Sequence, residues 1–83
     1  MVEEFFDRLS TELVKGAVNI RIKYVKDKDK YVVALMRNHS EIVRYYMTEK
    51  DVIEVIHTLN KHYIVKYDFI EGITIKVMVK KRY

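Results

Sequence analysis

The sequence predicts a two-layer α+β sandwich in the order α-β-β-β-α-β-β, with both helices on one face of a mostly antiparallel sheet. Three observations lead to this fold class: two segments have apolar residues at helical spacing, five segments have a period of two, and each helical segment carries one apolar stripe. The 83 residues contain 49% hydrophobic and 34% charged side chains. This composition is typical of one compact domain spanning residues 1–83.

The first segment predicts a helix that ends at about residue 15. Acidic residues lie in its first turns, where the positive end of a helix dipole favours them. Gly16 follows a basic last turn, as expected at a helix stop. The apolar stripe is formed by Val2, Phe6, Leu9 and Leu13.

From residue 17 the period changes to two, which predicts a strand over about 18–24 and two more over 31–37 and 41–47. Polar turns separate these strands. A four-residue loop at 27–30 gives the pairs Tyr24–Val33 and Ile22–Leu35, and a three-residue loop at 38–40 gives Leu35–Val43 and Val33–Tyr45. These registers gather the large apolar side chains on one face of the sheet.

Thr48 and Asp51 form a near capping box, which predicts the start of a second helix. The helix has an apolar stripe and ends near Asn60. The chain then forms a hairpin, residues 63–69 and 73–79, around Gly72. A three-residue loop, Ile70-Glu71-Gly72, keeps the odd-numbered apolar residues on one side through the pairs Phe69–Ile73, Tyr67–Ile75, Val65–Val77 and Tyr63–Val79.

The opposite face of the sheet is expected to be basic and exposed, and we interpret it as the functional surface. Cationic side chains there can contact phosphates while an aromatic ring stacks on a base, which makes nucleic acid, DNA or RNA, a candidate partner. The alternative to a binding surface is that these residues form the solvent-exposed outer face of an ordinary antiparallel sheet, with no binding role. The nucleic-acid candidates are Arg21, Lys23, Arg44, Tyr46, Lys66, Lys76 and Lys80.

Apolar side chains are interspersed on the same face, and they favour burial against a second copy of the chain or another protein. The interface candidates are Val32, Met36, Ile42, Ile64 and Met78. The two interpretations are compatible, because a homodimer joined through these side chains can leave the remaining basic surface free.

The charge is distributed unevenly along the chain, whose formal net charge is +4. Residues 1–14 have a net charge of −3 and residues 48–60 of −2, whereas residues 15–47 have +5 and residues 61–83 have +4. The helices are therefore expected to be acidic and the sheet basic, so that a modest total charge conceals a strongly positive face.

Several function classes are not supported by the sequence. With only Gly16 and Gly72 there is no Gly-rich phosphate loop, and no serine or threonine has a matched histidine and carboxylate at local spacing, so we expect no enzyme and no cofactor. The absence of cysteine excludes disulfides and thiolate metal sites, and the spacing of His57 and His62 does not indicate a metal site.

The apolar runs are too short for a membrane span, and acids stand where a secretion signal carries bases, so we expect a cytoplasmic protein without membrane contact. Lysine is abundant and glutamine and cysteine are absent, a composition resembling that of proteins from hot-living organisms.

The order of the first five elements resembles that of double-stranded-RNA-binding domains. Such domains carry a lysine-rich start to the second helix, whereas this chain reads Thr48-Glu49-Lys50-Asp51, and the final hairpin is foreign to them. We therefore assign the chain to no family. The sequence predicts a small non-enzymatic binding module that self-associates and offers a basic sheet face to nucleic acid. The alternative is a protein-interaction factor, an inhibitor or adaptor, without nucleic-acid affinity.

Overall fold

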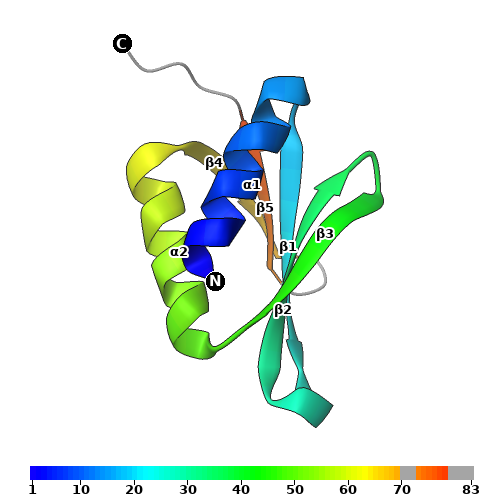
Figure 1. The fold of residues 1–83 in the computed structure, drawn as a ribbon, viewed down its shortest axis with the longest axis vertical. Helices are drawn as coiled ribbons and strands as arrows, with labels where there is room; N and C mark the ends of the chain where they lie inside the picture. Colours follow the sequence, from blue (N-terminus) through cyan, green and yellow to red (C-terminus); the bar gives the residue numbers. More distant parts are fainter. Residues whose placement is uncertain (70–72, 79–83) are drawn as a thin grey trace.

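A computed structural model describes residues 1–69 and 73–78 of the chain. It contains two helices and five strands in the expected order α-β-β-β-α-β-β, which confirms the α+β fold class (Figure 1). The elements are α1 (Val2–Lys15), β1 (Val18–Val25), a single 3₁₀ turn η1 (Lys26–Lys28), β2 (Lys30–Arg37), β3 (Ser40–Met47), α2 (Glu49–His62), β4 (Ile64–Asp68) and β5 (Ile73–Met78).

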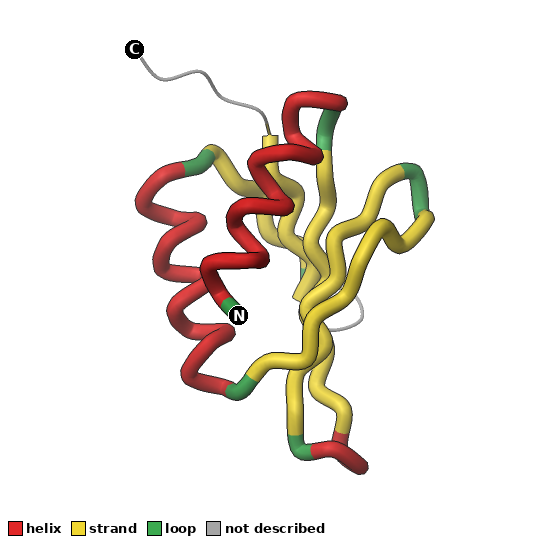
Figure 2. The backbone as a smooth tube through the Cα atoms, in the orientation of Figure 1, coloured by secondary structure: helices red, strands yellow, loops and turns green. Residues whose placement is uncertain are grey.

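The five strands form one antiparallel sheet in the order β3-β2-β1-β5-β4. After α2 the chain enters the edge strand β4 and returns through β5 to the side of β1. Both helices lie on the same face of the sheet, so the molecule has two layers (Figure 2). Among residues 1–69 and 73–78, no helix lies on the other face.

The core lies between the helices and the strand residues that point toward them. Phe5 and Leu9 of α1 and Val55 and Leu59 of α2 are fully buried there. They pack against the β-branched and aliphatic side chains of the central strands, which suits a pleated, buried surface. The buried strand residues of this core are Val18, Ile20, Ile22, Val33, Leu35, Met47, Ile75 and Val77.

The helix boundaries follow the local signals. α1 ends at Lys15 as expected, and Gly16 follows with φ 151°, a backbone conformation that other residues rarely adopt. At the start of α2 the Asp51 N–H donates to Thr48 Oγ1 at 3.2 Å and the Thr48 N–H donates to Asp51 Oδ2 at 3.4 Å, a complete capping box. α2 ends at His62, slightly beyond the expected Asn60.

The pairing of β1 with β2 differs from the expected register by two residues. Tyr24 pairs with Tyr31 and Ile22 with Val33, because the loop spans residues 26–29 and closes with Asp29 in the left-handed conformation (φ 50°). A shift of two residues leaves every side chain on its expected face. The β1–β2 hairpin extends past the helices (Figure 1), and Tyr24 near its end is 47% exposed.

The β2–β3 connection was expected to be a three-residue loop and is instead a two-residue turn followed by a β-bulge. Asn38 and His39 have φ of 51° and 67°, as a hairpin turn with two left-handed residues requires. Leu35 still pairs with Val43 as predicted, but Met36 now pairs with Glu41, which leaves Ile42 as the extra residue. Ile42 therefore packs against the core cluster, and its expected position on the opposite face is wrong.

The final hairpin has the predicted register where it is described. Val65 pairs with Val77 and Tyr67 with Ile75. The expected loop at 70–72 and the pairing partner Val79 lie outside the described residues. Within the described part of the chain, neither helix is long and apolar enough to span a membrane.

Candidate functional site

The surface of interest is the open face, defined as the side of the sheet opposite the helices. The strand pairings place its side chains in rows that run across the strands. Among its residues are Glu41, Arg44 and Tyr46 of β3, Val32, Ala34 and Met36 of β2, Asn19, Arg21, Lys23 and Val25 of β1, Thr74 of β5, and Ile64, Lys66 and Asp68 of β4.

One row brings two arginines to either side of a small residue. Ala34 pairs with Arg44 on one side and with Arg21 on the other. Both arginines are exposed, whereas Ala34 is only 1% exposed. The small side chain between two long ones makes this part of the sheet concave. Lys23 is also exposed, one row further along β1.

Arg44 is held by Glu41, the residue that the bulge brings onto this face. Arg44 Nε lies 2.9 Å from Glu41 Oε2 and Arg44 Nη2 lies 2.9 Å from Glu41 Oε1, a bidentate ion pair. This pairing lowers the pKa of Glu41, with a smaller contribution from the charge of Arg21, and it raises the pKa of Arg44. Glu41 is consequently a fixed negative charge within a basic surface.

Tyr46 is exposed at the edge of the same face, but its ring is already in contact with a cation. The Lys28 ammonium of η1 lies 4.4 Å from the ring centroid, and Arg44 Nη1 donates to the Tyr46 hydroxyl at 3.4 Å. The hydrogen bond from Arg44 and then the charge of Lys28 lower the pKa of Tyr46. A base can stack on that side of the ring only after Lys28 has moved away.

The rows at β1, β2 and β3 enclose a shallow hollow of about 480 Å³, here called the open-face hollow. Its cationic side chains are Arg21, Lys23, Lys26 and Arg44, and Glu41 is its carboxylate. The apolar part of the lining comes from Val25, Val32 and Ala34, with Tyr24 at one end. Cations therefore surround an apolar floor, an arrangement able to receive a ligand with a flat apolar part and an anionic part.

The other half of the open face has mixed charge. Lys66 is exposed beside Asp68, and both line a smaller hollow of about 380 Å³ with Asn19, Tyr67 and Thr74. Lys76 pairs with Lys66 and with Asn19, which places it in β5, although its side chain lies outside the described part. Lys80 lies outside the described residues. Of the seven nucleic-acid candidates, the structure thus brings Arg21, Lys23, Arg44 and Tyr46 together.

The apolar interface candidates are less exposed than the sequence suggests. Met36 is only 6% exposed, and Val32 is half-buried. Ile42 packs toward the core. Ile64 is 37% exposed at the far edge of the sheet, and Met78 pairs with it in β5 with a side chain outside the described part.

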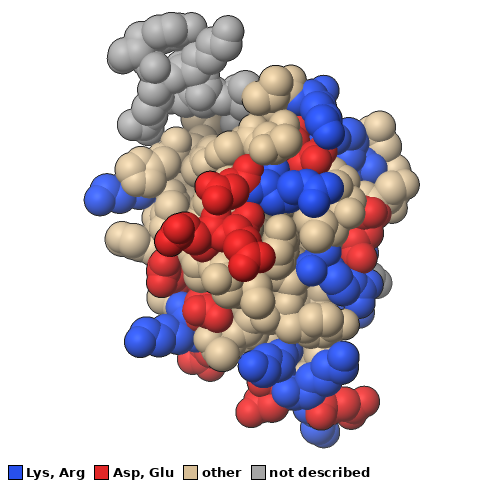
Figure 3. Space-filling model, viewed as in Figure 1, with Lys and Arg blue, Asp and Glu red and all other residues tan. Residues whose placement is uncertain are grey.

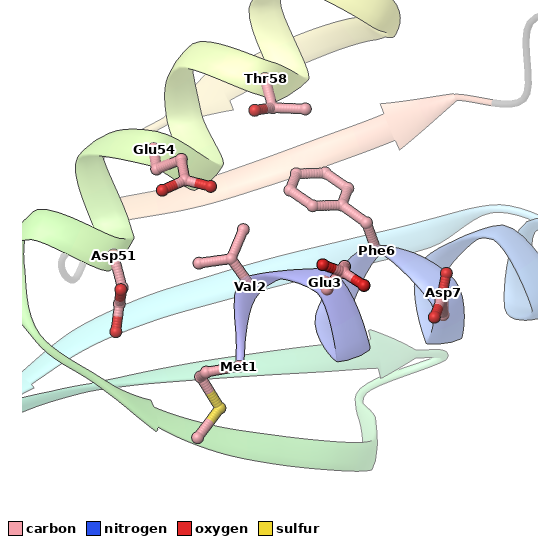
Figure 4. Close-up of a pocket in the computed structure, with 8 residues that line it drawn as sticks. All are labelled: Met1, Val2, Glu3, Phe6, Asp7, Asp51, Glu54 and Thr58. Atoms are coloured by element: carbon pink, nitrogen blue, oxygen red, sulfur yellow. The ribbon is translucent and has the colours of Figure 1, made fainter.

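The helix layer has the opposite charge. Acidic side chains gather over the two helices, and the β1–β2 turn carries both basic and acidic ones (Figure 3). A hollow of about 520 Å³ separates the helices, with Val2 and Phe6 on its apolar side (Figure 4). Its carboxylates, from Glu3, Asp7, Asp51 and Glu54, do not converge as metal ligands: the described residues contain no group of three or more histidine or carboxylate side chains able to hold a metal ion.

Sequence reasoning missed two contributors to the open face. Glu41 is not among the residues that the sequence placed on this face, and only the bulge, which no local pattern indicates, brings it there. Lys28 belongs to a turn that the sequence marks as polar, and its contact with Tyr46 depends on how the β1–β2 hairpin folds over. No family model, curated protein or solved structure matches the chain, so the site is interpreted from its own geometry.

Proposed function

We propose that the protein is a non-enzymatic module that binds nucleic acid through its open face. The observation that carries this proposal is the position of Arg21 and Lys23. Both are exposed on β1, the central strand of the sheet, and neither forms an ion pair with a described residue. Their charges are therefore available to phosphates.

The uneven charge of the two layers favours the approach of nucleic acid toward the open face. Acidic side chains gather over the helices (Figure 3). The open face of the sheet carries the exposed cations Arg21, Lys23 and Arg44. A polyanion is repelled by the helix layer and attracted by the open face, so it approaches from one side only. The total charge of +4 understates the attraction at that side.

Phosphate contacts predict a steep dependence on salt, because each neutralised phosphate releases counterions. The experiment measures fluorescence anisotropy of a labelled oligonucleotide, single-stranded and duplex, at about 20 and about 200 mM salt. We expect wild-type affinity to fall at least about tenfold between these conditions. The double variant Arg21→Ser with Lys23→Ser should lose most of the low-salt affinity.

The matched control is Lys50→Ser with Lys61→Ser, which removes two exposed cations from α2 on the helix layer. This control should bind almost as well as the wild type. Equal losses in the two double variants would contradict a site on the open face and indicate attraction by total charge alone.

A second copy of the chain is the alternative partner, supported by one observation. Ile64 is an apolar side chain 37% exposed at the edge strand β4, where unpaired backbone groups can also accept another strand. Association through apolar contacts should persist or strengthen at high salt. Sedimentation of the wild type and of Ile64→Lys tests this homodimer. A protein that binds other proteins and shows no nucleic-acid affinity at low salt would instead be an interaction factor.

A further inference from the structure

The open-face hollow combines cations, which a phosphate needs, with an apolar floor, which a bare phosphate does not need. It has an apolar floor, formed by Val32 and Val25, which are half-buried, and by Ala34, which is 1% exposed. It also has cations, Arg21 and Lys23, on the same side of the sheet. A ligand that uses both has a flat apolar body and an attached negative charge.

Glu41 adds a third requirement. Its carboxylate lines the hollow and is held by three contacts of 2.9–3.1 Å with Arg44, yet its side chain remains 36% exposed. Because each carboxylate oxygen has more than one lone pair, Glu41 can still accept a hydrogen bond from a ligand. It repels any phosphate that comes close. A ligand that fits therefore directs a donor toward Glu41 and its anion toward Arg21 and Lys23.

A nucleotide with an exocyclic amino group satisfies all three requirements. Its base is flat and apolar on both faces, its amino group donates, and its phosphate is anionic. In the major-groove edge contacts of nucleic acids, a glutamate accepts from the amino group of cytosine. In a duplex the base is stacked and paired, so only an unpaired nucleotide can enter a hollow with its face and its amino edge free.

We infer that the open-face hollow binds one unpaired nucleotide of a single strand and that Glu41 selects bases with an exocyclic amino group. This inference rests on the proposed function and specifies its ligand. Glu41 acts as the selecting acceptor, Arg44 fixes its orientation, and Arg21 and Lys23 hold the neighbouring phosphates. The discrimination is expected between cytosine, which carries an amino group at C4, and uracil, which carries an oxygen there.

The test compares oligo(dC) with oligo(dU) of equal length, so that the number of phosphates is the same. At low salt and neutral pH, anisotropy titrations of the wild type should give an affinity about fivefold higher for oligo(dC), the value of one good base-edge hydrogen bond. Glu41→Met removes the acceptor and keeps the length of the side chain. This variant should bind both strands more tightly, because a negative charge is lost, and the ratio of the two affinities should fall to about one.

Glu54→Met is the matched control, since Glu54 is an exposed glutamate on α2, on the other layer. It should keep the fivefold ratio. Equal wild-type affinities for oligo(dC) and oligo(dU), with steep salt dependence, would overturn the selection by Glu41 and leave the proposed function standing. Absence of binding to either strand at low salt would overturn both. A preference for oligo(dC) that survives in Glu41→Met would also contradict the role of Glu41.

Discussion

Arg37 at the end of β2 donates to two parts of Glu12 on α1, the carboxylate oxygen Oε1 at 2.9 Å and the backbone carbonyl oxygen at 2.6 Å. The Glu12 side chain is only 4% exposed, and Arg8 and Lys15 of the same helix also contact its carboxylate. This cluster ties the last turn of α1 to the sheet. Arg37 also supplies a hydrogen-bond donor to the Glu12 carbonyl oxygen near the helix end, where the last carbonyl groups have no partner within the helix.

The cluster predicts how stability changes with pH. The hydrogen bond from Arg37, followed by that from Arg8, lowers the pKa of Glu12 from 4.5 to about 2. A carboxyl group whose pKa is lower in the folded state stabilises that state at pH values above 4.5, and this stabilisation is lost as the pH falls toward 2. We therefore expect the thermal midpoint of the wild type to decrease across this interval.

The variant Glu12→Gln should remove this part of the pH dependence and lower the midpoint at pH 7 by at least about 5 °C, because it leaves Arg37 without its charged partner. Thermal unfolding followed by circular dichroism at pH 7 and pH 3 measures both effects. Glu54→Gln on the exposed side of α2 is the control and should behave like the wild type. If Glu12→Gln and the wild type lost the same stability between the two pH values, the cluster would not be the cause.

The β2–β3 turn predicts a stabilising substitution. His39 has φ 67°, a conformation that costs a residue with a side chain more than it costs glycine, and the residue is exposed. His39→Gly preserves the turn type, since Asn-Gly is the favoured pair for such turns. We expect a gain of about 0.5–1 kcal/mol in the free energy of unfolding, measured by urea denaturation.

Lys26→Gly is the control for this substitution. Lys26 lies in another exposed turn, and its φ is not positive. Glycine there should give no gain and a small loss, because it only makes the unfolded chain more flexible. Stabilisation by both glycines, or by neither, would mean that the backbone conformation of His39 is not the source of the effect.

The element order and the two faces of the sheet could be predicted from the sequence, because both follow from local periodicity. Alternation places Ile20 and Ile22 on the core face whatever the partner strand, and this is why the shift of two residues between β1 and β2 did not alter the faces. The position of Glu41 could not be predicted. It depends on a turn one residue shorter than expected and on the compensating bulge at Ile42, and these two changes cancel in the pairing of Leu35 with Val43.

The burial of Glu12 is a second feature that could not be predicted from the sequence. Within α1 it is one of several glutamates, and nothing nearby marks it as buried. Its main partner, Arg37, is 25 residues away and belongs to another layer. Such contacts depend on how the helix is set against the sheet, so they become visible only in three dimensions. Local charge patterns predicted which layer is acidic but not which acid is bound in the interior.

Salt dependence gives a quantitative prediction for the open face. For single strands, the slope of log K against log salt changes by about 0.7 for each phosphate contact. Arg21→Ser and Lys23→Ser should each reduce the slope by about this amount, and the double variant by about twice as much. Titrations of oligo(dC) at four or more salt concentrations measure it. Lys50→Ser on α2 should leave the slope unchanged, and an equal reduction by that variant would exclude specific phosphate contacts at Arg21 and Lys23.

Two apolar positions on the open face should respond differently to a charge. Met36 is 6% exposed and lies between Asn19 and Glu41, so Met36→Lys places an ammonium group where water is largely excluded. We expect this variant to lose about 2 kcal/mol or more of the free energy of unfolding.

Ile64 is 37% exposed at the sheet edge, and Ile64→Lys should change the stability of the folded chain by less than about 1 kcal/mol. Urea denaturation at a protein concentration below any self-association measures both values. Only Ile64→Lys can then serve as a clean test of a homodimer, because a loss of association in Met36→Lys would also follow from unfolding. A stable, well-folded Met36→Lys variant would show that Met36 is accessible after all and would return it to the set of contact residues.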